Sequence, residues 1–323
     1  PVHTRGAEAS PFSIGEWGPD GQWALLEHGV PVGPVSFPPE PAFYKLATSD
    51  GVPYWKIAQL HSRKVLATTI LQTCIRYGNA STKCQFCAIG ESLRAGRTIR
   101  RKTPDQLAEV ASAAKALDGI DNVVMTTGTP ETTDRGAAIL AESADAIKRA
   151  TGLPIQAQCE PPDDFAWFGK LREAGVDALG MHLEAWDESV RRRIMPGKAE
   201  VPREYYLDAF AEAVSVFGRG QVSTYLLAGL GDSPDDLLEA SGILIAIGVY
   251  PFVVPFVPVT GTPLANRRPP TAGFMQSVLG PLGQMLSEAG MTSETVKAGC
   301  AKCGACSALS AFEKKPEASC SFS

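Results

Sequence analysis

From Val65 onward, short apolar runs alternate with longer amphipathic segments, and this pattern predicts strands and helices in turn. The expected strands are Ala67–Leu71, Asn122–Thr126, Ile155–Cys159, Ala178–Leu183, Val222–Leu227 and Phe252–Val257. The expected helices are Asp105–Leu117, Asp134–Thr151, Asp163–Ala174, Pro202–Phe217, Pro234–Ile247 and Thr271–Ala289. Because strands that alternate with helices form parallel sheets, we expect an α/β fold.

Six strand–helix units are fewer than the eight of a complete TIM barrel, so they predict a partial (β/α)6 barrel of TIM type. Right-handed crossovers bring the carboxyl ends of its strands to one rim, where the active site is expected. We place this barrel at residues 65–290, after an N-terminal arm and cap (1–64) and before a cysteine-rich C-terminal extension (291–323). Residues 1–20 are expected to form a poorly ordered arm, and Val52–Ala58 a strand of a small sheet or cap.

Composition and charge narrow the classes of function. With 323 residues, 44% of them hydrophobic, the chain is long enough to bury a large core. A net charge of −5 gives no strongly basic surface, so nucleic acid is not expected as a partner. No apolar run reaches the roughly 18 residues that a membrane span needs. The N-terminus lacks a signal-peptide pattern and the eight cysteines are clustered, which together predict a reducing, cytoplasmic location.

Three cysteines follow the first expected barrel strand, Cys74, Cys84 and Cys87, with the spacing C-x9-C-x2-C. Structural zinc normally takes four protein ligands, and catalytic zinc sites usually include histidine. Cubane iron–sulfur clusters take cysteine thiolates, normally four. Three local thiols without an obvious fourth cysteine ligand favour an iron–sulfur cluster in which one iron is free to bind a small ligand. The alternatives are a zinc knuckle and three unrelated thiols. Cys159, on the apolar face of a strand, is expected to be a buried small hydrophobe.

The C-terminal extension holds a second group of cysteines, Cys300, Cys303 and Cys306, followed by Cys320. The spacing C-x2-C-x2-C is typical of iron–sulfur proteins. We expect a second, auxiliary cluster, with Cys320 as its fourth ligand or with the fourth site open to substrate. A zinc site and a tail of free thiols are the alternatives. If the tail folds over the rim, this cluster closes the open side of the barrel.

Polar residues mark the ends of the third and fourth expected strands. Gln156, Gln158 and Glu160 share one face by the strand period of two, and a polar face inside a barrel is costly unless it meets a ligand or partner. His182 and Glu184 share a face at the end of the next strand. We therefore take Glu160, His182 and Glu184 as candidate catalytic residues, with satisfied structural groups as the alternative.

These features together resemble the radical S-adenosylmethionine (SAM) superfamily, in its biotin-synthase-like branch. Phe86 directly precedes the last cysteine of the loop, as in that family, although the common spacing there is C-x3-C-x2-C. The segment 126–131, Thr-Thr-Gly-Thr-Pro-Glu, loosely resembles the Gly-Gly-Glu-like loop that binds the SAM amino group through backbone carbonyls. Segment 227–233 resembles a Gly-Leu-Gly-Glu stretch near the adenine, and segment 255–264 resembles the Pro-x-x-Pro-x-x-Gly-Thr-Pro-Leu run.

The resemblance covers about residues 65–290 and implies both cofactors and a site. It implies that Cys74, Cys84 and Cys87 ligate a [4Fe–4S] cluster whose fourth iron binds SAM. The implied SAM-binding residues are Phe86, Thr127, Gly128, Thr129, Glu160, Gly229 and Val259. Members of this branch cleave SAM reductively, form a 5′-deoxyadenosyl radical and abstract hydrogen from the substrate. A small-molecule substrate and an electron donor of the flavodoxin or ferredoxin type are thus implied.

Three classes of function follow. The first is a radical SAM enzyme acting on a small metabolite, and the chain is also similar to radical SAM proteins of bacterial gene clusters built around a nitrilase. The second is tRNA modification, because C-x9-C-x2-C resembles the catalytic subunit of the Elongator complex; the acidic charge balance and the lack of an acetyltransferase-like domain disfavour it. The third is a non-catalytic iron–sulfur or zinc scaffold, which would need none of the rim motifs.

Overall fold

A curved sheet of seven strands forms the centre of the computed structural model, which describes residues 10–18 and 21–313. The strands are β4 (Gln59–His61), β5 (Val65–Thr69), β6 (Asn122–Thr126), β7 (Ile155–Gln158), β8 (Ala178–Gly180), β9 (Val222–Ala228) and β10 (Val249–Pro255). Their order is β10-β9-β8-β7-β6-β5-β4. The six strands β5 to β10 are parallel, as predicted for a partial barrel, whereas β4 is an additional edge strand antiparallel to β5.

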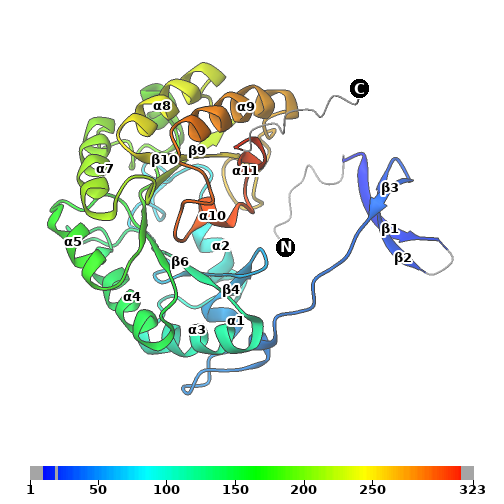
Figure 1. The fold of residues 1–323 in the computed structure, drawn as a ribbon, viewed down its shortest axis with the longest axis horizontal. Helices are drawn as coiled ribbons and strands as arrows, with labels where there is room; N and C mark the ends of the chain where they lie inside the picture. The colour runs from blue at the N-terminus through cyan, green and yellow to red at the C-terminus, as the bar shows by residue number, and fades with distance from the viewer. Residues whose placement is uncertain (1–9, 19–20, 314–323) are drawn as a thin grey trace, which may run out of the picture.

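Helices cover the outer, convex side of this sheet (Figure 1). They are α3 (Pro104–Asp118), α4 (Ala137–Thr151), α5 (Ala166–Glu173), α7 (Arg203–Phe217), α8 (Pro234–Ala246) and α9 (Ala272–Glu288). Each predicted helix is present, with ends that differ from the prediction by a few residues. The start of α3 shows why: Thr103 caps the amide of Gln106, Gln106 caps the amide of Thr103, and Pro104 occupies the first position.

The core lies between the sheet and these helices. Val123 and Met125 of β6 and Ala157 of β7 are fully buried in it, among side chains from the surrounding helices. The residues between them, such as Val124 and Gln158, line the inside of the barrel instead. The strand period of two therefore sends one set of side chains to the core and the other to the interior.

The N-terminal region differs from two predictions. Residues of the expected disordered arm form β1 (Phe12–Trp17), which pairs with β2 (Gln22–Glu27) and then β3 (Val30–Pro34) in a separate antiparallel sheet. Figure 1 shows this sheet beside the barrel at the end of an extended connection. A small sheet was expected here, but not one that begins at Phe12.

The second correction concerns Val52–Ala58, which is not a strand. Tyr54–Ile57 form the short helix α1, preceded by Pro53. Tyr54 and Ile57 are buried, and the Tyr54 hydroxyl hydrogen-bonds to Glu109 of α3 at 3.0 Å. Packing against α3 thus outweighs the strand preference of these aromatic and β-branched residues.

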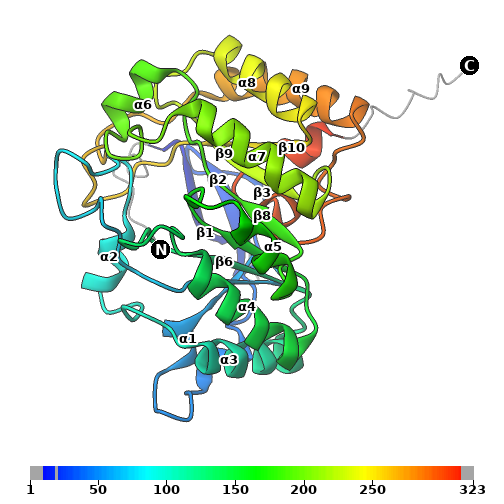
Figure 2. The same ribbon diagram turned by 90° about the vertical axis from the view of Figure 1, so that its left-hand side faces the viewer.

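Shorter helices, which the periodicity did not predict, occupy the connections. They are the 3-10 helix η2 (Ala42–Lys45), α2 (Ile89–Arg94), α6 (Glu188–Ile194), α10 (Cys300–Cys303) and α11 (Leu309–Phe312). Figure 2 shows α2 and α6 in the loops on one side of the sheet. No helix among residues 10–18 and 21–313 is long and apolar enough to cross a membrane.

The C-terminal extension enters the barrel from the end where its strands begin. The amide of Lys297 donates to Gln221, directly before β9, and that of Gly299 donates to Asn122, the first residue of β6. The tail therefore crosses the amino ends of the strands, and α10 lies inside the arc of the sheet (Figure 1). The tail therefore does not fold over the carboxyl-end rim, an arrangement that the sequence left open, because buried polar side chains at the amino ends pair with its backbone.

Two glycines of α9 test how firmly the tail is docked. A Cβ at Gly283 would lie 2.4 Å from the backbone of Phe312, whereas a Cβ at Gly280 would meet no atom within 4 Å. We expect Gly283→Ala to lower the free energy of unfolding by about 1–3 kcal/mol through overpacking. Gly280→Ala should raise it by up to about 1 kcal/mol through helix propensity. Calorimetric melting of both variants measures this, and equal stability of the two would contradict the close contact.

Candidate active site

The loop that carries Cys74, Cys84 and Cys87 leaves the carboxyl end of β5 and packs on the loop after β6. The amide of Ile75 donates to the Thr129 carbonyl at 3.0 Å, and the amide of Gly128 donates to the Leu71 carbonyl at 2.9 Å. A Cβ at Gly128 would lie 2.1 Å from the Thr73 carbonyl oxygen, so only glycine fits here. The loop expected to bind SAM is therefore in direct contact with the cysteine loop.

The three thiols of this loop are close enough to interact electrostatically. Burial raises the pKa of Cys84 to about 12 and also raises that of Cys87; each has a further contribution from a neighbouring cysteine of the set. Among the described residues, no three His, Cys, Asp or Glu side chains converge closely enough to hold a metal ion. The donor set fits a cubane cluster, and binding would require these side chains to turn toward one centre and lose their protons.

A buried ion pair ties the cysteine loop to the end of β7. Arg76 contacts Glu160 through two hydrogen bonds, Nη2 to Oε2 at 2.7 Å and Nε to Oε1 at 3.2 Å. The Thr129 hydroxyl donates to the same carboxylate at 3.0 Å. Burial by itself raises the pKa of Glu160, but the hydrogen bonds from Arg76 and Thr129 and the charges of Lys198 and Arg76 together outweigh it and hold the pKa below its ordinary value. Glu160 is therefore a charged anchor of the loop.

His182 and Glu184 lie beyond the end of β8, which stops at Gly180. The His182 ring stacks on Tyr225 with 4.4 Å between centroids, and its Nδ1 accepts the Tyr225 amide at 3.2 Å. Its buried Nε2 has no partner among the described residues. Burial and the nearby charge of Lys198 lower the pKa of His182 to about 3, so the ring is neutral with its proton on Nε2. Glu184 instead pairs with Lys198, at 3.3 Å.

The remaining predicted SAM contacts belong to the connections after β5, β9 and β10. Phe86 packs against a small apolar cluster that includes Leu230 and Phe256. Gly229 has a φ of 100° and its carbonyl accepts from Arg267 at 2.7 Å, while the Val259 carbonyl accepts from Thr262. The Leu264 amide also donates to the Gln85 carbonyl at 3.2 Å, so the β10 loop and the cysteine loop meet. Which of these residues touch SAM stays a prediction.

The tail cysteines lie inside the barrel against the polar face of β7. Gln158 Nε2 is 3.1 Å from the Cys300 sulfur, and the Cys300 amide donates to Gln156 Oε1 at 3.1 Å. Burial raises the pKa of Cys300 to about 11, with smaller contributions from Cys306 and Cys303. The polar face of β7 thus meets the chain's own tail. Cys159 is buried in the core, as predicted.

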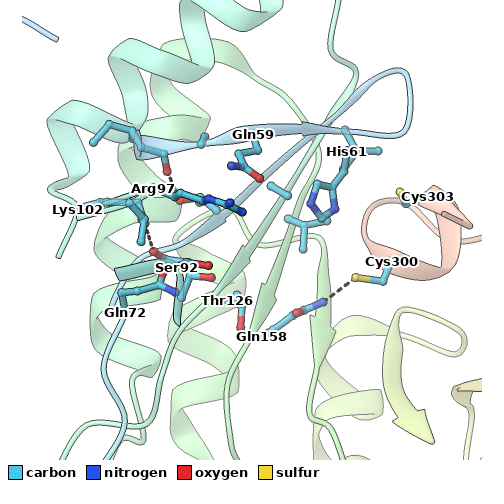
Figure 3. Close-up of a pocket in the computed structure, with 18 of the residues that line it drawn as sticks. Gln59, His61, Gln72, Ser92, Arg97, Lys102, Thr126, Gln158, Cys300 and Cys303 are labelled. Carbon is cyan, nitrogen blue, oxygen red and sulfur yellow. Dashed lines mark hydrogen bonds between the residues drawn. The ribbon is translucent and has the colours of Figure 1, made fainter. Parts of the chain in front are cut away.

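Cys320 lies outside the described residues. The other seven cysteines are all free, and three of them, Cys300, Cys303 and Cys306, line a cavity of about 810 Å³ inside the barrel. Figure 3 shows this cavity between β4, β5 and β6 on one side and the tail on the other. It also reaches Gln72, two residues before Cys74. The cavity therefore extends from the tail cysteines to the start of the loop that carries the first cysteine group.

Several residues of this cavity were not predicted from the sequence. Lys56, His61, Arg97, Lys102 and Tyr225 all line it. None of them belongs to a family motif, and none is a polar residue at the carboxyl end of an expected strand. Only the basic run 100–102, directly before the α3 cap, gave a local signal, and such runs are usually solvated.

The family-level comparison agrees with this geometry. Residues 76–241, half of the chain, match the family model described as the radical SAM superfamily. The chain therefore belongs to the radical SAM superfamily and is a radical SAM enzyme. Membership implies a [4Fe–4S] cluster and SAM, for which the loop of Cys74, Cys84 and Cys87 supplies suitable donors.

Individual relatives cover the chain only in part. A segment of 125 residues is 34% identical to bacteriochlorophyllide c C-7(1)-hydroxylase of Chlorobaculum limnaeum, covering 38% of this chain and 31% of that protein. The chain thus spans about a third of the length of this curated relative. Among solved structures, methylornithine synthase is 20% identical with a TM-score of 0.53, over 70% of this chain and 63% of that one.

A radical SAM methyltransferase from Sphaerobacter thermophilus covers more of the chain. It is 16% identical with a TM-score of 0.52, over 90% of this chain and 76% of that one. At these identities the two structures show the shared fold alone. They confirm the partial barrel and carry no information about substrate.

Two glutamates near Arg76 provide a matched test of the loop anchor. Glu160 is buried with it, whereas Glu200 lies 3.9 Å away with 70% of its side chain exposed. Glu160→Gln leaves a buried guanidinium without its counter-charge and should cost on the order of 3 kcal/mol of unfolding free energy. Glu200→Gln should cost less than about 1 kcal/mol.

The pH dependence follows from the lowered pKa of Glu160. Its stabilising contribution is fully present above the ordinary glutamate pKa of 4.5 and is lost as the pH falls through the lower pKa of the folded state. The stability difference between wild type and Glu160→Gln should therefore shrink below about pH 4.5. Thermal melts between pH 3 and pH 7 measure it, and a difference independent of pH would contradict the charged pair.

Proposed function

We propose that the enzyme binds a [4Fe–4S] cluster through Cys74, Cys84 and Cys87, with SAM on the fourth iron, and acts on a small molecule in the barrel cavity. The bound cofactors supply reductive SAM cleavage and a 5′-deoxyadenosyl radical that abstracts hydrogen from the substrate. The observation that carries this proposal is the cavity itself, which begins beside the cysteine loop at Gln72 and extends through the barrel. An electron donor of the flavodoxin or ferredoxin type completes the system.

The SAM site is proposed at the carboxyl-end rim. Thr127, Gly128 and Thr129 would present backbone groups to the methionyl amine, and their loop already hydrogen-bonds to the cysteine loop. Phe86, Gly229 and Val259 would lie near the adenosine. These contacts need precise positioning more than special side chains, because the substrate C–H must lie within a few Å of the reacting carbon.

The polar residues at the rim are proposed to have two roles, positioning of the cysteine loop and binding of SAM or substrate. Glu160 acts as a positioning residue that holds the cysteine loop through Arg76. His182 offers an unpartnered Nε2–H, and Glu184 a carboxylate shared with Lys198, as contacts for SAM or substrate. A neutral imidazole donor suits a carbonyl or carboxylate oxygen.

A second cluster on Cys300, Cys303 and Cys306 is proposed at the other end of the cavity. The three thiols come from within seven residues and interact with one another electrostatically. Cys320 or a substrate atom would complete the ligand set. A cluster here would face the substrate from the side opposite to SAM.

The reaction class is proposed to be functionalisation of a C–H bond. The curated relative is named as a hydroxylase at C-7(1) of bacteriochlorophyllide c, and hydroxylation likewise replaces a C–H bond. The volume of the cavity, about 810 Å³, accommodates a ligand of metabolite size.

The first cluster is tested by single substitutions. Cys74→Ala, Cys84→Ala and Cys87→Ala should each abolish formation of 5′-deoxyadenosine after anaerobic reconstitution, because a three-thiol site loses a ligand. Cys159→Ala is the matched control, since this cysteine is buried in the core away from both groups, and it should keep activity and iron. Full SAM cleavage by Cys74→Ala would show that Cys74 is not a ligand of the cluster.

The second cluster is tested by iron content. Reconstituted wild type should hold about eight irons per chain, the sum of two cubanes, and the triple variant Cys300→Ala, Cys303→Ala, Cys306→Ala about half of that. Formation of 5′-deoxyadenosine should survive in the triple variant. A wild-type value near four irons, or zinc at these thiols, would exclude an auxiliary cluster.

A further inference from the structure

We propose that the barrel cavity binds a substrate with an anionic group, carboxylate or phosphate, and that Lys102 holds this group. The inference rests on the proposed function, in which the cavity is the substrate site. It adds the chemical class of the substrate and a residue that determines specificity.

Lys102 is a buried cation without a counter-ion. Lys102 is 2% exposed, and its Nζ donates a hydrogen bond to the backbone carbonyl of Thr69 at the end of β5. No carboxylate among residues 10–18 and 21–313 forms an ion pair with it. Burial lowers the pKa of this amine to about 8, and no neighbouring acidic group counteracts the effect. A buried charge of this kind is costly unless something pairs with it.

A second deeply buried lysine of the barrel, Lys198, is paired with a carboxylate, as buried lysines usually are. Lys198 is 8% exposed and lies 3.3 Å from the carboxylate of Glu184. Burial opposes the charge of Lys198, but the attraction of Glu184, together with smaller contributions from Tyr206, Glu160 and Cys84, outweighs it and raises the pKa. Lys102 differs from Lys198 in that it lines a cavity large enough to admit a ligand. An anion from outside the chain would therefore supply the partner that Glu184 supplies to Lys198.

The charge of the cavity wall points in the same direction. Three cationic side chains line it, Lys56, Arg97 and Lys102, and no aspartate or glutamate of the described residues is among its lining. The His61 imidazole also lines it but adds no charge at neutral pH, because burial lowers its pKa. Figure 3 shows the Arg97 guanidinium on the side of Lys102, whereas the His61 imidazole lies on the other side, near Cys303. In a chain with a net charge of −5, such a wall is a local excess of positive charge. Low-dielectric walls of one sign concentrate ligands of the opposite sign.

The rest of the cavity lining suits the uncharged part of such a molecule. Val65, Ala67, Val124 and Ala305 contribute apolar surface, and Figure 3 shows Cys300 and Cys303 on the side of the cavity away from Lys102. A substrate with its anionic end at Lys102 would direct its uncharged part toward the tail cysteines. This arrangement would fix the orientation of the substrate. A fixed orientation is needed if hydrogen is to be abstracted from one particular carbon.

A pair of probes that share one aromatic skeleton and differ by a sulfonate group tests the charge preference without knowledge of the substrate. The probes are 8-anilinonaphthalene-1-sulfonate and its uncharged analogue N-phenyl-1-naphthylamine, measured by anaerobic equilibrium dialysis on the reconstituted full chain. We expect Lys102→Met to weaken binding of the sulfonate about tenfold to a hundredfold, as for loss of a charge-assisted hydrogen bond. Binding of the uncharged probe should change less than about twofold, and Lys102→Arg should keep most of the sulfonate affinity.

Lys115→Met is the matched control, because Lys115 also donates to a backbone carbonyl, that of Thr151 at 2.7 Å, but does not line the cavity. Its effect on either probe should be negligible. Equal loss of both probes in Lys102→Met would show a structural role and overturn the proposal.

A site-resolved measurement excludes binding of the probes elsewhere. Acetylation of each lysine by acetic anhydride is followed by peptide mass spectrometry, with Lys115 as internal reference. The sulfonate should slow acetylation of Lys102 several-fold more than the uncharged probe does; no such difference would overturn the proposal. Protection by SAM alone would assign Lys102 to the cofactor carboxylate and also overturn it. Neither measurement requires catalytic turnover. A failure of the proposed SAM cleavage would therefore be recognised separately from a failure of the anion site.

Discussion

The buried ion pair between Arg76 and Glu160 is the interaction on which the geometry of the site depends. Arg76 stands two residues after Cys74, and Glu160 stands two residues after the end of β7. The same guanidinium also donates to the carbonyl of Gly197, after α6. Because either charge alone would be costly in this environment, the pair holds three connections of the rim in one arrangement.

Once the rim is held, the two cysteine groups approach the cavity from opposite ends of the barrel. The first leaves the carboxyl end of β5, and the second enters past the amino ends of β6 and β9. Gln156 and Gln158 make this entry favourable, since their buried amides need partners and the tail supplies a backbone amide and a thiol. The tail thereby fills part of the barrel interior and leaves a cavity of ligand size beside it.

Local pattern predicted most of the barrel and part of the site. The six parallel strands and the six covering helices follow from alternation and capping, as at Thr103, and the first cysteine group follows from its position after β5. The prediction failed where packing opposed local preference, as for Tyr54–Ile57, which form a helix against α3. It also failed for Lys102, because nothing in a short basic run indicates that one of its members is buried without a counter-ion.

The sequence by itself determined the fold class, the family resemblance and the identity of the thiols, since each depends on residues close together in the chain. Only the tertiary structure decided that Arg76 pairs with Glu160, 84 residues away, and that the tail enters the barrel at Gln156 instead of covering the rim. Only the tertiary structure also places Lys102 in a cavity whose wall carries basic and no acidic side chains. Such contacts depend on how distant segments share buried space, and no local period or spacing encodes that.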